Sequence, residues 1–208
     1  FDAKINLRAE RSKIKKEADM SIKKPIRYAF LQIPNYSMVT FSSAVASLRG
    51  ANYISKQDLY EWQVVSMDGV PVTASVGFEV TPTLHVNDLN LNDLEAVIVC
   101  GGTFIDRAYN KNTIAFLRKA ANAKIKIGST CTGSYLLAAA GLLDGYKSTI
   151  HWENLASMRE EFPNVLMSSN LFAIDRDRFT CSGGNSSLDM MLQFVSNHHG
   201  PELISQNN

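Results

Sequence analysis

The run IKIGSTCTG, residues 125–133, places a cysteine where nucleophilic chemistry is possible. A sharp turn from a strand directly into a helix requires small neighbours, here Gly128, Ser129 and Gly133, and it projects one side chain above the sheet edge. That side chain is Cys131. A thiol at a helix N-terminus has a lowered pKa, which favours the thiolate nucleophile. The alternative interpretation is a small buried hydrophobic residue.

A second turn with exposed backbone follows the apolar run EAVIVC, where Gly101 and Gly102 stand together. Open α/β sheets place ligands at the carboxyl ends of their strands. The main-chain N–H groups of Gly102 and Thr132 could therefore converge on a carbonyl or anionic oxygen. The alternative is a tight turn without a ligand.

His151 is the candidate partner for the thiol. It lies twenty residues after Cys131, at the end of a short apolar segment and directly before Trp152. A lone histidine is also common as a structural residue. The chain has no cluster of His, Cys and acidic residues at zinc-site spacing, so we expect no metal and no cofactor. The remaining histidines have no comparable setting: His85, His198 and His199.

The elements that must position these residues alternate between buried-strand runs and helical stripes. Such alternation predicts a mostly parallel sheet with helices on both faces, a flavodoxin-like α/β fold in a single domain. The four strongest strand segments are residues 26–33, 60–67, 95–100 and 125–129.

Helices are predicted between these strands and at the end of the chain. One apolar stripe has the spacing of a helix face and comprises Phe41, Ala44, Val45 and Leu48. Thr113 is a plausible N-cap for a further helix. The last helix covers residues 185–199 and is closed by Gly200 and Pro201.

Composition limits the class of protein. With 208 residues, 45% hydrophobic and 20% charged, the chain suits one soluble domain. No apolar run approaches the ~20 residues of a membrane-spanning helix. The three cysteines and the absence of an apolar leader favour a reducing cytoplasm. A net charge of +1 gives no general attraction for nucleic acid.

The first 24 residues differ from the rest. Residues 1–24 contain eight Lys/Arg and four Asp/Glu and few large apolar side chains, so we expect a solvated tail or an artificial extension. A nucleic-acid-binding or partner-binding arm is the alternative. The folded domain is expected over residues 25–204.

Longer runs of sequence resemble a known family. GSTCTGSYLLAAAGLLDGYKSTIHWENL (128–155) and RFTCSGGNSSLDMMLQFV (178–195) resemble the PfpI-like branch of the class I glutamine amidotransferase-like superfamily. With IPNYSM (33–38), SAVASLRGAN (43–52) and LYEWQVVSMDGVPVTAS (59–75), the chain more closely resembles the N-terminal sensor domain of AraC-type transcriptional regulators. The resemblance implies that Cys131 is the elbow cysteine and His151 its following histidine.

Two departures from the PfpI-like enzymes bear on catalysis. PfpI-like proteases have a histidine directly after the cysteine, whereas this chain has Thr132. Many relatives have an acidic residue after the first strand, whereas residues 35–48 contain no Asp or Glu. Because a nucleophile needs a base and the base needs an orienting group, binding is favoured over catalysis.

The resemblance implies a ligand-sensing domain that binds a small, possibly nitrogenous metabolite and acts as a homodimer. DNA would be bound by a C-terminal helix-turn-helix domain, for which the eight residues after Gly200 leave no room. The alternative is a PfpI-like cysteine hydrolase or glyoxalase/deglycase. The expected ligand-binding residues comprise the elbow, the glycine turn, the histidine and three aromatics that could enclose a cation: Cys131, Thr132, Gly101, Gly102, His151, Tyr36, Phe41 and Trp152.

Overall fold

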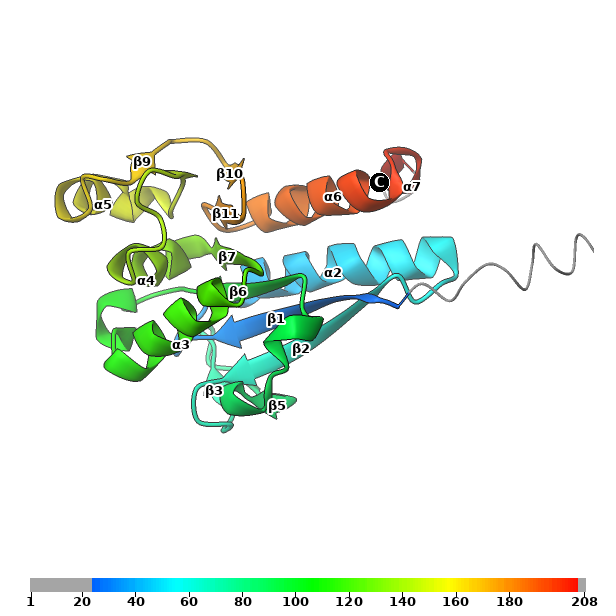
Figure 1. The fold of residues 1–208 in the computed structure, drawn as a ribbon, viewed down its shortest axis with the longest axis horizontal. Coiled ribbons are helices and arrows are strands. Elements are labelled where there is room, and N and C mark those ends of the chain that lie inside the picture. The colour runs from blue at the N-terminus through cyan, green and yellow to red at the C-terminus, as the bar shows by residue number, and fades with distance from the viewer. Residues whose placement is uncertain (1–23, 206–208) are drawn as a thin grey trace, which may run out of the picture.

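A seven-stranded sheet organises the computed structural model, which describes residues 24–205 (Figure 1). The order across the sheet is β10-β11-β7-β6-β1-β2-β5. Every neighbouring pair is parallel except β10 with β11. The strands are β1 (Ile26–Gln32), β2 (Tyr60–Ser66), β5 (Leu84–His85), β6 (Ala96–Cys100), β7 (Lys126–Thr130), β10 (Phe172–Asp175) and β11 (Arg178–Cys181).

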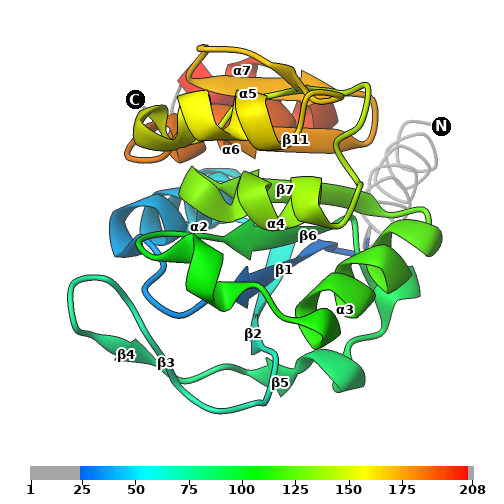
Figure 2. The same ribbon diagram turned by 90° about the vertical axis from the view of Figure 1, so that its left-hand side faces the viewer.

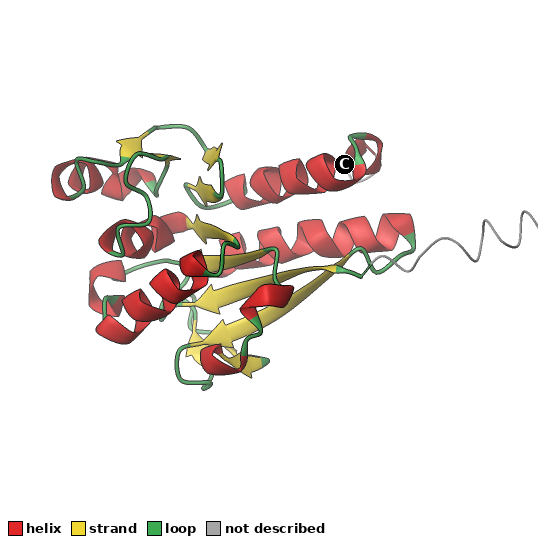
Figure 3. Ribbon diagram, viewed as in Figure 1, coloured by secondary structure: helices red, strands yellow, loops and turns green. Residues whose placement is uncertain are grey.

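Helices cover both faces of this sheet, and two small strand pairs lie outside it (Figure 3). The α-helices are α2 (Met38–Ser55), α3 (Lys111–Asn122), α4 (Ser134–Ala139), α5 (Leu155–Glu161), α6 (Ser186–His199) and α7 (Glu202–Ser205). The 3-10 helices are η1 (Val86–Asp88), η2 (Leu91–Asp93), η3 (Ile105–Ala108), η4 (Cys131–Gly133) and η5 (Trp152–Asn154). The small pairs are β3 (Val72–Thr73) with β4 (Glu79–Val80), and β8 (Lys147–Ser148) with β9 (Leu166–Met167).

The two faces of the sheet form separate hydrophobic cores because strand side chains alternate between faces. On one face, Ala29 and Leu31 of β1 pack with residues of α3 and α4. On the other, Tyr28 and Phe30 pack with residues of α2 and α6, which run side by side (Figure 1). Burial on both faces accounts for the almost continuously apolar strands, and the predicted α/β class is confirmed.

Most elements lie where the sequence places them, and one helix start differs. Asn110, not Thr113, caps α3: its side-chain oxygen accepts a hydrogen bond from the Thr113 N–H at 2.8 Å. Thr113 lies inside the first turn and is 1% exposed. The prediction of Thr113 as N-cap was therefore wrong by one helical turn. The expected tail lies, apart from Lys24, outside the described residues.

At the amino end of the strands, a polar cluster fixes the end of α6 to the sheet. Glu95 pairs with Lys126 and lies 3.6 Å from Nε2 of His198. The Nδ1 atom of the same histidine is 3.1 Å from the Tyr60 hydroxyl. These contacts, chiefly the hydrogen bond from His198, lower the pKa of Glu95 to about 2.

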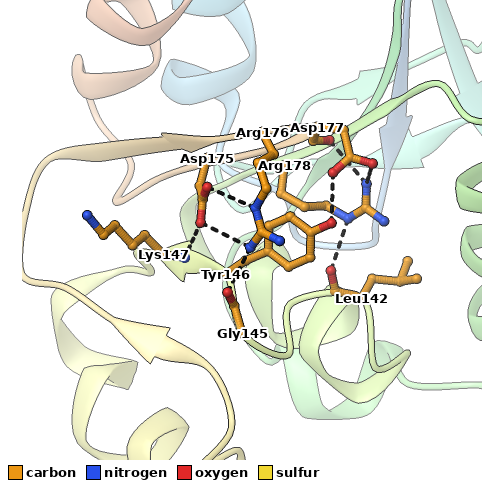
Figure 4. A network of polar contacts seen from close by, with 8 residues as sticks. All are labelled: Leu142, Gly145, Tyr146, Lys147, Asp175, Arg176, Asp177 and Arg178. Carbon is orange, nitrogen blue, oxygen red and sulfur yellow. Dashed lines mark hydrogen bonds and ion pairs between the residues drawn. The ribbon is translucent and has the colours of Figure 1, made fainter.

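A second polar network anchors the turn between β10 and β11 (Figure 4). The ring of Tyr146 lies under the guanidinium of Arg176, whose central carbon is 3.7 Å from the ring centroid. The Tyr146 hydroxyl donates to Asp177 at 2.9 Å, and Arg178 donates to the Leu142 carbonyl at 2.9 Å. The network joins this turn to the segment after α4 and so fixes β11 beside β7.

Among residues 24–205, no helix is both long enough and apolar enough to cross a bilayer.

Candidate functional site

The expected elbow lies at the carboxyl edge of the sheet, which faces the viewer in Figure 2. β7 ends at Thr130, and the chain turns at once into η4 and α4. Cys131 makes the turn in the left-handed region with φ of 57°, a conformation that few residues other than glycine adopt. Strained backbone of this kind is typical of functional turns. Its side chain is 7% exposed.

Buried hydroxyl groups hold the His151 segment against this elbow. The Ser129 and Ser134 hydroxyls are 2.8 Å apart, and Ser134 donates to the Thr149 carbonyl at 2.7 Å. The Thr149 N–H in turn donates to Thr180 of β11 at 2.8 Å. Two residues further on, the His151 N–H donates to the Cys131 carbonyl at 3.3 Å. The structure thus confirms that cysteine and histidine lie together.

Gly183 completes this group, and sequence reasoning missed it. A Cβ atom at Gly183 would lie 3.4 Å from Cys131 Sγ and 3.5 Å from His151 Cδ2, so a side chain here would stand directly against both groups. Its φ of 111° is a glycine conformation. The signal in the sequence was the pair Gly183-Gly184 directly after a predicted strand.

The thiol is not activated. Burial raises the pKa of Cys131 to about 11; the Thr132 N–H lowers it in part, and the charge of Glu153 raises it further. The expected lowering of this pKa was therefore wrong, because loss of hydration outweighs the dipole of the short η4–α4 segment. Among the described contacts there is no hydrogen bond between Cys131 and the His151 imidazole, whose Nδ1 instead lies 3.5 Å from Glu153.

The two backbone turns expected to bind an oxygen do meet. Thr132 Oγ1 donates to the Gly102 carbonyl at 2.6 Å. Gly102 is paired with Tyr36 in an isolated antiparallel bridge, whose hydrogen bonds come from the neighbouring Ser37 and Thr103 N–H groups. The Gly102 N–H is therefore not used in that bridge.

A cavity of about 560 Å³ opens above these turns. Asp106, Glu153 and Glu161 line it, and its lining includes no Lys or Arg. Tyr135 and Phe104 supply aromatic surface, and proximity to Glu161 contributes, after burial, to a raised pKa of the Tyr135 hydroxyl. The cavity is therefore acidic and partly aromatic.

Four of the eight expected site residues line this cavity: Cys131, Thr132, Gly102 and His151. The expectation that aromatics near the start of α2 would enclose the ligand must be corrected. Tyr36 is 0% exposed and Phe41 is 9% exposed, and their rings pack edge to face in the core at 5.7 Å. Trp152 is 73% exposed and does not line the cavity, while Gly101 packs against the backbone of Gly133.

Comparison with known proteins identifies the family of this chain. The model of the DJ-1/PfpI family matches residues 30–197. The HTH-type transcriptional regulator GbdR of Pseudomonas aeruginosa is 45% identical over 179 residues, which are 86% of this chain and 48% of GbdR. The regulator CdhR of the same species is 40% identical over 85% of this chain and 52% of CdhR. The chain thus spans about half the length of these curated relatives.

A solved structure also links the chain to AraC-type regulators. The crystal structure of an AraC family transcriptional regulator from Pseudomonas putida matches this chain with a TM-score of 0.79 and 30% sequence identity, and the match covers 88% of this chain and 97% of that one. Among more distant matches, an isonitrile hydratase from Pseudomonas putida is 38% identical over 90 residues, which are 43% of this chain and 39% of the hydratase. The chain belongs to the DJ-1/PfpI family and is a domain of the type found in AraC-type transcriptional regulators.

Proposed function

We propose that this domain binds a small nitrogenous metabolite in the Cys131 cavity and thereby regulates DNA binding by a helix-turn-helix region of the complete regulator. The observation that supports this most directly is the charge of the cavity. Three carboxylates line it and its lining includes no Lys or Arg, so a positively charged ligand would be attracted and an anion repelled.

The cavity can also recognise the two ends of such a ligand differently. Tyr135 offers an aromatic face near Glu161, and a cationic nitrogen over an aromatic ring gains about 0.5–2 kcal/mol. The ring of Phe104 already carries the Arg107 guanidinium, 4.6 Å from its centroid. At the elbow, backbone N–H groups at Gly102 and Thr132 suit a carboxylate or carbonyl oxygen. A small zwitterion such as an amino acid or a betaine fits both ends.

The state of the thiol supports binding over catalysis. With a pKa of about 11, Cys131 is almost entirely protonated at pH 7, and Glu153 opposes thiolate formation. His151 has no hydrogen bond to it that would remove the proton. Residues 35–48 contain no Asp or Glu that could assist the thiol, and Thr40 of α2 accepts a hydrogen bond from the Gly184 N–H at 3.1 Å.

A thermal-shift screen tests the proposal. Arginine, glycine betaine and their uncharged or anionic analogues would be added to the wild-type domain, since a ligand at 100 times its Kd adds about 2.7 kcal/mol of stability. We expect the cationic or zwitterionic compounds alone to raise Tm.

Glu153→Gln should weaken the response several-fold, because one of the three carboxylates is lost. Glu160→Gln is the matched control, since Glu160 is exposed on α5, which follows η5 directly, and does not line the cavity. Stabilisation by anions only, or an equal loss in both variants, would contradict the proposal.

The second candidate is a cysteine-dependent hydrolase or glyoxalase/deglycase, favoured by the strained elbow at Cys131. Turnover of such substrates that disappears in Cys131→Ser would establish it.

A further inference from the structure

A second cavity of about 530 Å³ opens at the carboxyl ends of β1 and β2. It is nearly as large as the Cys131 cavity and shares no lining residue with it. Gln32 and Ser66, the last residues of the two strands, form part of its lining. Apolar surface comes from Met67, Val70 and Pro71 of the following loop.

A thin wall made of three chain segments separates the two cavities. In each segment, residues one or two apart face opposite sides: Asn35 and Thr73 line the second cavity, whereas Ser37 and Ser75 line the first. In η3, Asp106 lines the first cavity and Arg107 the second.

Backbone hydrogen bonds join the segments of this wall. The Asn35 N–H donates to the Thr73 carbonyl at 2.9 Å, and the Thr103 N–H donates to the Asn35 carbonyl at 3.1 Å. The Ser75 N–H donates to the Tyr36 carbonyl at 3.0 Å. The wall therefore gives the second cavity a fixed boundary, and the two charges of η3 are divided between the cavities.

The charges that line the second cavity differ from those of the first. Arg107 is exposed, and its guanidinium lies 4.6 Å from the Phe104 ring centroid without a hydrogen bond or ion pair to any described residue. The carboxylate of Asp68 is engaged in its own turn, where it accepts from the Ser66 hydroxyl at 3.4 Å and from the Val70 N–H at 3.3 Å. Because these donors are neutral, Asp68 keeps its negative charge, and the lining carries one charge of each sign; Arg107 is the residue of this lining that can pair with an anion.

Amide groups add hydrogen-bonding capacity. The half-buried Asn35 and the exposed Asn110 line this cavity. Gln32 is 1% exposed and both of its side-chain amide atoms are closed off from solvent, so this residue borders the cavity without presenting its amide to a ligand there.

We propose that the second cavity binds a small monocarboxylate with a short apolar chain. Arg107 would hold the carboxylate with charge-assisted hydrogen bonds, which are roughly twice as strong as hydrogen bonds between neutral groups. The amides of Asn35 and Asn110 complete the polar side, and the tail lies on the apolar loop at Val70 and Pro71. This ligand would carry a carboxylate alone, whereas the ligand proposed for the Cys131 cavity carries a cationic nitrogen.

Nuclear magnetic resonance can locate the ligand. In ¹H–¹⁵N spectra of residues 1–208, sodium butyrate is titrated, with butyramide as the uncharged analogue of the same shape. We expect butyrate to shift the side-chain amide signals of Asn35 and Asn110 with saturation. Butyramide should bind at least tenfold more weakly, because it lacks the charge that Arg107 pairs with.

Two variants distinguish binding at Arg107 from nonspecific attraction of butyrate to any positive surface charge. Arg107→Gln should weaken butyrate binding at least tenfold, whereas Lys111→Gln, at an exposed residue outside both cavities, should leave it unchanged. Equal binding of butyrate and butyramide, or an unaffected Arg107→Gln variant, would overturn the proposal. Shifts confined to Gly102, Thr132 and His151 would also overturn it, because they place the carboxylate in the first cavity.

Discussion

Two side chains at the elbow decide what the site can do. Cys131 is buried beside the charge of Glu153, and both effects keep its thiol protonated. The imidazole of His151 is directed to Glu153 rather than bonded to the sulfur. The same carboxylate that opposes a thiolate would attract a cationic ligand, so the residues at this site suit recognition of positive charge.

Alkylation tests the state of Cys131. Its pKa of about 11 predicts that the rate of reaction with iodoacetamide rises about tenfold per pH unit from pH 7 to pH 10, because only the thiolate reacts. Mass spectrometry would follow each cysteine separately, and Cys131→Ser should remove the fastest site. Cys181, with a similarly raised pKa but 0% exposure, is the internal control and should react more slowly. A plateau in the Cys131 rate near pH 7 would show an activated thiolate instead.

Among the elements, the chain of buried hydroxyls from β7 to β11 positions the His151 segment. Ser134→Ala removes the donor to Thr149 and the partner of Ser129, and leaves a buried carbonyl without its hydrogen bond. We expect a loss of about 1–3 kcal/mol in the free energy of unfolding, measured by urea denaturation. The exposed Ser42→Ala in α2 should cost much less, and an equal cost would contradict this role for Ser134.

The attachment of α6 to the sheet predicts an acid-dependent stability. The pKa of Glu95 is lowered from 4.5 to about 2 in the folded protein, first by the hydrogen bond from His198. Its contribution is therefore fully present above pH 4.5 and disappears as the pH falls towards 2. The difference in unfolding free energy between wild type and Glu95→Gln should shrink over this range. A difference that stays constant from pH 7 to pH 2 would exclude the linkage.

Features that depend on residues close together in the chain could be predicted from the sequence, whereas features that depend on tertiary packing could not. Strands such as β6 and the elbow at Cys131 could be predicted because burial on both faces and small turn residues leave direct patterns. The acidic lining could not, because Asp106 and Glu161 meet through tertiary packing of segments far apart in the chain. The prediction that Tyr36 would enclose the ligand failed for a similar reason. Whether its side chain points to the core or to the cavity depends on the residues that pack around it, which lie elsewhere in the chain.

At the scale of the whole molecule, we expect a homodimer. A regulator with a helix-turn-helix region commonly binds two DNA half-sites, and the symmetry of a homodimer matches such a pair of sites. Sedimentation at tens of micromolar protein should give twice the chain mass of 23.0 kDa. A single species of 23.0 kDa under those conditions would contradict the expectation.

The packing of α6 on α2 also has a consequence during synthesis on the ribosome. The Ser47 hydroxyl contacts the Leu188 carbonyl, 141 residues later in the chain. At about 5–20 residues per second, the apolar side of α2, including Phe41 and Leu48, stays uncovered for on the order of ten seconds. A nascent chain of this length exposes surface that chaperones bind, and a chain released before α6 is made would aggregate through it.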